Sequence, residues 1–134
     1  MTVEPTECRR TTGNSVRTYR DLEAWQEAVN LVEATYRTAA DLPRSERFGL
    51  ISQMQRSAVS VPANIAEGYG RKGRGEFLRH LRIARGSLME LETHLLIAQR
   101  LTFVTRERLR PVWRLAQTVG RLLNGLIRAV EAWP

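Results

Sequence analysis

The feature that most constrains the fold is a heptad pattern of apolar residues in the second half of the chain. Apolar residues recur there at alternating spacings of three and four, first as Phe77, Leu81, Ala84, Leu88, Leu91, Leu95 and Ala98, and again as Leu109, Val112, Ala116, Val119, Leu123, Leu126 and Val130. Because an α-helix has 3.6 residues per turn, each series lies along one side of a helix. The pattern predicts two long amphipathic helices, Arg74–Leu101 and Glu107–Ala132.

The first half of the chain carries a weaker form of the same pattern. The residues that follow this spacing are Leu22, Trp25, Val29, Val32, Tyr36 and Ala39. They predict a helix over Tyr19–Ala40, which starts after the capping pair Thr18 and Asp21 and ends before Pro43. A further helix is predicted over Ser45–Glu67.

Three local signals refine the prediction for that second helix. Ser45 is a suitable N-cap, and Gly68 is a suitable left-handed residue to end it. Pro62 lies inside the helix and removes one backbone hydrogen bond, which predicts a kink at that point.

Several apolar residues remain outside these predicted stripes. They are Ala24, Ala28 and Leu31 in the first helix and Trp113, Leu115, Leu122 and Ile127 in the last. Either these helices have broad apolar faces, or the additional residues form an interface between copies of the chain.

Together the four segments predict an all-α protein, an antiparallel up-down-up-down four-helix bundle. The 134 residues suit a single domain, which we place at residues 18–134, with residues 1–17 as a disordered tail. No apolar run approaches the ~20 residues of a membrane span, and the N-terminus lacks the apolar centre of a secretory signal. We therefore expect a cytoplasmic protein without membrane association. Its single cysteine, Cys8, cannot form an internal disulfide.

The formal net charge of +7 is distributed unevenly along the chain. Residues 21–41 are mainly acidic, whereas residues 71–86 and 106–134 are mainly basic, and every basic residue except Lys72 is an arginine. A basic segment suits a polyanion such as nucleic acid, but it also suits a head-to-tail contact with an acidic segment of another copy. The predicted nucleic-acid-binding residues form one strip: Arg71, Lys72, Arg74, Arg79, Arg82 and Arg85.

Residues 68–73 match the pattern GxGxxG. The motif follows a predicted helix instead of a strand, which excludes a dinucleotide-binding fold. It predicts a flexible cationic loop that leads into a helix N-terminus, where free amides favour anions.

The sequence predicts no catalytic residue, metal or cofactor. A di-iron bundle needs Glu-x-x-His pairs, but His80 and His94 each follow a glutamate, Glu76 and Glu90, by four residues. They fall away from the apolar stripe, so we expect pairs on the helix surface. One cysteine and two histidines do not support a zinc site, and no nucleophile is paired with a base.

The segment Gln53–Gly68 is unusually rich in small and polar residues for a buried helix. Small residues allow helices to approach closely, and polar residues between helices need partners. We predict a structural polar network in which Arg56, Asn64 and Glu67 pair with Glu90 or Glu92 across the bundle.

The same segment carries a family resemblance. The residues that match are Phe48-Gly49-Leu50, Gln53, Arg56-Ser57-Ala58, Asn64-Ile65-Ala66-Glu67-Gly68, Glu76-Phe77, Leu81, Ala84-Arg85-Gly86-Ser87-Leu88 and Glu90-Leu91-Glu92. In these motifs the chain resembles a four-helix-bundle family first noticed as proteins encoded in intervening sequences of large-subunit ribosomal RNA genes. The resemblance covers roughly Tyr19 to Val104.

The resemblance implies a left-handed antiparallel bundle that assembles into a ring of five protomers. One branch, the accessory proteins of diversity-generating retroelements, is strongly basic and binds nucleic acid and a reverse transcriptase. The family offers no established catalytic residues to carry over. We therefore expect a non-enzymatic, oligomeric bundle that binds RNA or DNA through arginines. The alternative is an assembly scaffold that binds a protein partner and whose charges serve its own oligomer interfaces.

Overall fold

The structure is a computed structural model that describes residues 15–134. Its elements are a 3₁₀ helix at Tyr19–Asp21, α1 at Glu23–Ala39, a second 3₁₀ helix at Arg44–Glu46, α2 at Leu50–Gly70, α3 at Arg74–Arg100 and α4 at Arg106–Glu131. Within these described residues there is no strand. The predicted all-helical four-helix bundle is therefore confirmed.

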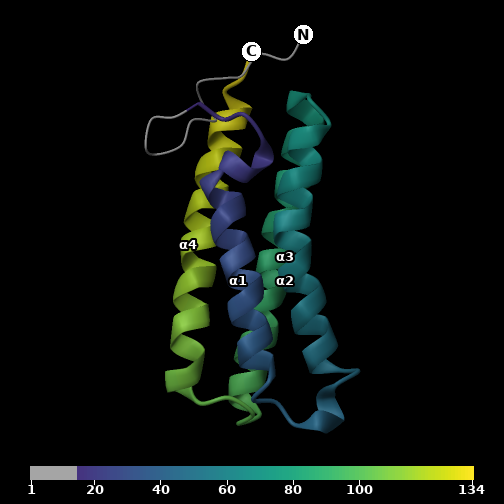
Figure 1. The fold of residues 1–134 in the computed structure, drawn as a ribbon, viewed down its shortest axis with the longest axis vertical. Helices are drawn as coiled ribbons and strands as arrows, with labels where there is room; N and C mark the ends of the chain where they lie inside the picture. Colours follow the sequence, from purple (N-terminus) through teal and green to yellow (C-terminus); the bar gives the residue numbers. More distant parts are fainter. Residues whose placement is uncertain (1–14) are drawn as a thin grey trace.

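The four helices lie side by side, and in Figure 1 each runs in the direction opposite to the helix before it. α1 packs against α2 and α4, and α3 packs against the same two helices. The contact between α2 and α3 is the most extensive of the four. This pair is joined by only three residues, 71–73, which keeps the two helices close at that end.

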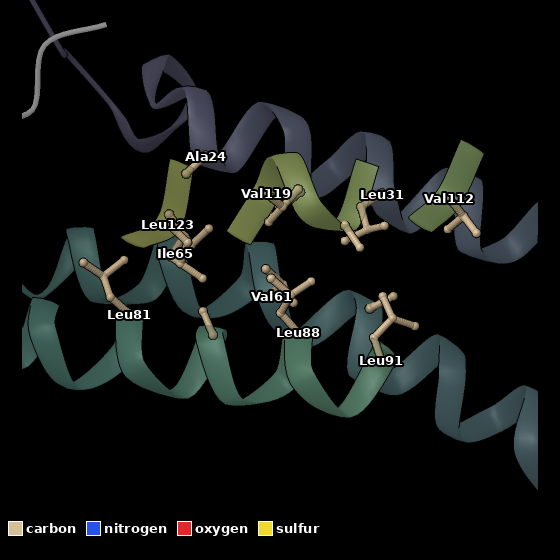
Figure 2. Packing of buried hydrophobic residues seen from close by; sticks show 14 of the residues in the cluster. Ala24, Leu31, Val61, Ile65, Leu81, Leu88, Leu91, Val112, Val119 and Leu123 are labelled. Atoms are coloured by element: carbon tan, nitrogen blue, oxygen red, sulfur yellow. The ribbon is translucent and has the colours of Figure 1, made fainter. Parts of the chain in front are cut away.

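The heptad stripes of α3 and α4 form the core as predicted. Every residue of both series is buried. Figure 2 shows Leu81, Leu88 and Leu91 of α3 pointing into the interior that Val119 and Leu123 of α4 also line. Burial of these side chains removes apolar surface from water, which is the main force holding the four helices together.

The predicted core stripe of α1 was right only in part. Leu22 and Ala39 of that stripe are buried, but the other buried residues of α1 belong to the second stripe, Ala24, Ala28 and Leu31, which continues as Thr35 and Thr38. Tyr36 of the predicted stripe is 47% exposed. Alanines let α1 approach its neighbours closely, and each threonine hydroxyl is satisfied inside the helix. Thr35 donates to the carbonyl of Leu31 at 2.7 Å and Thr38 to that of Ala34 at 2.9 Å.

The helix ends differ from the sequence-based boundaries. Thr18 and Asp21 do form a capping box, but it caps the 3₁₀ helix that precedes α1. Ser45 lies in the second 3₁₀ helix and does not cap α2, which begins at Leu50. The predicted stop at Gly68 was also wrong, because α2 continues to Gly70 and the left-handed residue is Lys72, with φ 57°.

Two further predictions, a kink at Pro62 and a tail over residues 1–17, have different outcomes. α2 continues through Pro62, and a bend of its axis there stays a prediction. Val16, which the sequence placed in the tail, is buried in the core. Residues 1–14 of the predicted tail, including Cys8, lie outside the described residues.

Candidate functional site

The edge where α3 meets α4 carries two rows of arginines. On α3, Arg74 and Arg82 both reach Glu131 of α4. Arg74 Nη2 donates to the Glu131 carbonyl at 3.0 Å, and Arg82 Nη2 lies 3.1 Å from its carboxylate. Arg85 Nη1 donates to Asn124 Oδ1 at 3.3 Å. These contacts hold the α3 row along α4.

The second row lies on α4. Gln117, Asn124 and Glu131 recur every seven residues, and each contacts α3, with Gln117 Nε2 donating to Glu92 Oε2 at 3.0 Å. An arginine precedes each of them by three residues and is therefore its neighbour on the helix surface. These arginines are Arg114, Arg121 and Arg128, all exposed.

We call the two rows the α3–α4 arginine face: Arg74, Arg82, Arg85, Arg114, Arg121 and Arg128. Within residues 15–134, none of the three α4 arginines takes part in an ion pair, although Arg121 Nη2 donates to Thr118 Oγ1 at 3.3 Å. Their charges are available to an outside partner. The face therefore holds more positive charge than Glu92 and Glu131 neutralise.

The structure divides the basic strip predicted from the sequence. Arg74, Arg82 and Arg85 belong to the α3–α4 arginine face. Arg71 and Arg79 instead lie toward α2, and Lys72 is exposed in the connection between α2 and α3. The predicted flexible loop is shorter than expected, because residues 68–70 of the GxGxxG match belong to α2.

Arg71 and Arg79 are largely neutralised by carboxylates of their own chain. Arg71 Nη2 lies 2.8 Å from Glu67, and Arg79 Nε lies 3.2 Å from Glu76. The hydrogen bond from Arg71 lowers the pKa of Glu67, and the hydrogen bond from Arg79 lowers the pKa of Glu76. Both glutamates therefore stay charged and compete with any external anion.

The sequence reasoning did not place the α4 arginines in a binding site. The seven-residue spacing of Arg114, Arg121 and Arg128 was a usable signal, because it places all three on one side of a helix. Their position next to the α3 arginines, however, depends on how α3 and α4 pack.

The contact between α2 and α3 is a polar seam. His80 Nδ1 lies 3.0 Å from Asn64 Oδ1, Ser60 Oγ lies 2.8 Å from Ser87 Oγ, and His94 Nδ1 lies 3.3 Å from Ser57 Oγ. The prediction that both histidines lie on the helix surface was wrong. His80 is buried at 5% exposure and His94 is half-buried, because α2 covers this side of α3.

The predicted polar network differs from the one found. Asn64 takes part through His80 and Ser60, and Glu67 pairs with Arg71 and lies 3.9 Å from His80 Nε2. Glu92 faces α4 and accepts from Gln117. Among the residues that the structure describes, Arg56 and Glu90 make no hydrogen bond or ion pair, so the expected pairing across the bundle does not form.

His94 makes the stability of the bundle sensitive to pH. Burial lowers its pKa, an effect that nearby Glu90 partly opposes. The unfolded chain therefore binds a proton at His94 more readily than the folded chain does below about pH 6.5, the usual imidazole value. Folding stability contributed by this residue should fall as pH drops from 7.5 to 5.

This pH effect is measured by thermal unfolding at both pH values. The parent should lose more thermal stability at pH 5 than His94→Gln, which removes the titrating group but keeps a polar side chain beside Ser57. Equal losses in the two proteins would assign the pH effect to other groups.

The described part of the chain has no group of three or more histidine, cysteine, aspartate or glutamate side chains placed to hold a metal ion. None of the helices in residues 15–134 is both long and apolar enough to cross a membrane.

Comparison with known proteins identifies the family of this chain. No curated protein matches the chain. A solved structure from Bacteroides thetaiotaomicron, a protein of unknown function from the S23 ribosomal protein family, shares 24% identity and has a TM-score of 0.72. The match covers 78% of this chain and 95% of that one, and at this identity it shows a common fold. The model of the 23S rRNA-intervening sequence proteins matches residues 20–125, and the chain therefore belongs to that family.

Proposed function

We propose that this protein is a non-enzymatic, cytoplasmic helical-bundle protein that binds RNA or DNA on the α3–α4 arginine face. The observation that supports the proposal is the pair of arginine rows, with six cations beside two carboxylates. Guanidinium groups bind phosphate oxygens through charge-assisted, often bidentate hydrogen bonds.

The spacing of the arginines suits a regular polyanion. At a rise of 1.5 Å per residue, Arg114, Arg121 and Arg128 stand about 10.5 Å apart along α4. Double-stranded DNA carries about one charge per 1.7 Å of its axis, so each arginine has phosphates within reach when the nucleic acid lies along the helix. Contacts to phosphates do not read bases, so sequence preference at this face should be slight.

The test compares two triple variants that remove the same charge. One replaces Arg114, Arg121 and Arg128 with glutamine, and the control replaces Arg71, Lys72 and Arg79 with glutamine. Binding to short RNA and DNA is measured by fluorescence anisotropy over a range of salt concentrations. The first variant should bind all sequences more weakly. The slope of log affinity against log salt concentration should also be smaller by about three than that of the parent.

The control variant should bind almost as well as the parent, because two of its three cations are already paired with Glu67 and Glu76. Equal weakening of both variants would mean that net charge, and not this face, determines binding. Absence of binding by the parent at low salt would reject the proposal.

Self-association as a scaffold is the second candidate, and exposed apolar residues on α3 favour it. Ile83 and Ile97 lie two heptads apart on one side of this helix, and Leu101 follows them. The additional apolar residues of α1 and α4 do not support self-association, because all of them are buried or half-buried within the bundle.

A closed homo-oligomer, of five copies by family resemblance, and a protein partner such as a reverse transcriptase stay predictions. Light scattering tests the first: a molar mass of 15.3 kDa at micromolar concentration would reject it.

A further inference from the structure

A second surface feature lies on the other flank of α3, beside the N-terminal half of α2. There an open groove of about 510 Å³ runs between the two helices. The groove is open to solvent, so a ligand would lie along it without being enclosed. Its lining is predominantly polar, and Gln53, Arg56, Ser87 and His94 contribute hydrogen-bonding groups to it.

Three side chains at this groove are not explained by folding. Phe48 is 88% exposed, the most exposed large apolar side chain in the described residues. Arg56 and Glu90 are exposed and make no hydrogen bond or ion pair within residues 15–134. None of the three contributes to the core. Their grouping along one groove leaves an aromatic ring, a cation and a carboxylate available to a ligand.

The groove offers both hydrogen-bond donors and acceptors. Ser57 Oγ lies 2.9 and 3.1 Å from the backbone carbonyls of Gln53 and Met54 and 3.3 Å from His94 Nδ1. The neutral imidazole of His94 offers one N–H donor and one acceptor nitrogen. Arg56 donates only, and Glu90 when charged accepts only.

Phe48 adds an aromatic surface at the end of the groove. The Arg47 guanidinium lies 5.2 Å from the ring centroid, over one face. The ring and its two nearby cations, Arg47 and Arg56, combine the two elements with which proteins hold unpaired nucleotides: a stacking platform and charges for the phosphate.

Other ligand classes fit this lining less well. An apolar ligand would leave the polar groups of the groove without partners. A simple inorganic anion would be repelled by Glu90. A nucleotide uses every group, because its base has a flat apolar face and polar edges and its phosphate is anionic.

We propose that the groove between α2 and α3 is a nucleotide-binding site that takes an unpaired guanine nucleotide. The base stacks on Phe48, the phosphate pairs with Arg56, and Glu90 accepts hydrogen bonds from the adjacent N1–H and N2–H groups of guanine. The site is separate from the α3–α4 arginine face and does not require it.

The experiment titrates the full-length protein with GMP and follows amide and arginine side-chain signals by ¹⁵N NMR. Shifts should be concentrated at Gln53, Arg56, Glu90 and His94. Phe48→Ala should weaken GMP binding by about 5- to 150-fold, the loss expected for one stacked base. Arg56→Gln should weaken GMP binding but leave guanosine binding nearly unchanged, because guanosine lacks the phosphate.

Matched controls separate this site from the rest of the surface. Tyr36→Ala removes another exposed aromatic ring, which lies on α1 and does not line the groove, and should bind GMP like the parent. The Arg114, Arg121 and Arg128 triple variant should also retain GMP binding, so failure of the arginine face and failure of the groove give different results.

Three outcomes would overturn the inference. The first is no shift at 10 mM GMP, and the second is a set of shifts confined to the arginines of α4. The third is a fall in molar mass on Phe48→Ala with no effect on GMP binding, which would show that a second copy of the chain covers this groove. Phe48 is exposed, so its replacement does not endanger the fold.

Discussion

Raising the salt concentration from 50 to 200 mM is expected to weaken binding of RNA or DNA by about 10³–10⁵-fold. This is the effect of neutralising about 6–10 phosphates, because each neutralised phosphate releases condensed counterions, and added salt opposes that release. The α3–α4 arginine face supplies six cations from one chain, and because Arg82 is paired with Glu131, one chain alone reaches at most the lower end of that range. Repetition of the face in an oligomer would move the effect toward the upper end.

Anisotropy titrations at several salt concentrations measure this dependence directly. The slope should be similar for RNA and DNA of different sequence, since phosphates are common to all of them. If binding is tight but the slope of log affinity against log salt is nearly flat, the interaction is not made through phosphates. That result would contradict binding at this face. GMP binding in the α2–α3 groove should depend much less on salt, because only one phosphate is involved.

Gly68→Ala is expected to lower the free energy of unfolding by about 1–3 kcal/mol, the usual cost of overpacking. A Cβ atom at position 68 would lie 2.6 Å from Cβ of His80 and 3.2 Å from Cδ1 of Phe77. The His80 Cβ is bonded directly to the backbone and cannot rotate away, so α2 and α3 would have to separate. Their separation would also disturb the hydrogen bond between His80 and Asn64.

Gly86→Ala is the matched control for this substitution. Gly86 lies inside α3 and is exposed, and a Cβ atom there would meet no other part of the structure within 4 Å. Alanine should therefore stabilise the protein by about 0.5–1 kcal/mol through its greater helix propensity. Urea unfolding followed by circular dichroism, at one protein concentration, measures both variants. A Gly68→Ala protein as stable as the Gly86→Ala protein would show that the α2–α3 spacing does not depend on this contact.

The sequence predicted the helices and two of the core faces because these depend on local periodicity. In α3 and α4 a single apolar stripe stands out against polar residues, so the buried face is unambiguous. In α1 two apolar stripes share the same spacing, one with mainly large side chains and one with mainly small side chains. Periodicity shows which residues lie on a common face, but it does not show which face can approach a neighbouring helix most closely. Packing selected Ala24, Ala28 and Leu31.

The polar seam was not predictable for a related reason. His80 and His94 lie off the apolar stripe of α3, and a helix considered alone would expose them. α2 covers them because Gly68 allows close approach and because Asn64 and Ser57 supply hydrogen-bond partners. A buried polar side chain depends on its partner, and these partners lie 16 and 37 residues away in the chain.

The arginines show the same division between sequence and tertiary structure. The sequence by itself determined the number of cations, their concentration in residues 71–86 and 106–134, and the helices that carry them. The pairs Arg71–Glu67 and Arg79–Glu76 are four and three residues apart, so the spacing in the sequence already allowed them. Only the tertiary structure decided that the packing of α4 on α3 brings Arg114, Arg121 and Arg128 beside a second row. Coulombic interactions depend on distance in space, and distance between helices is set by the packing of the core.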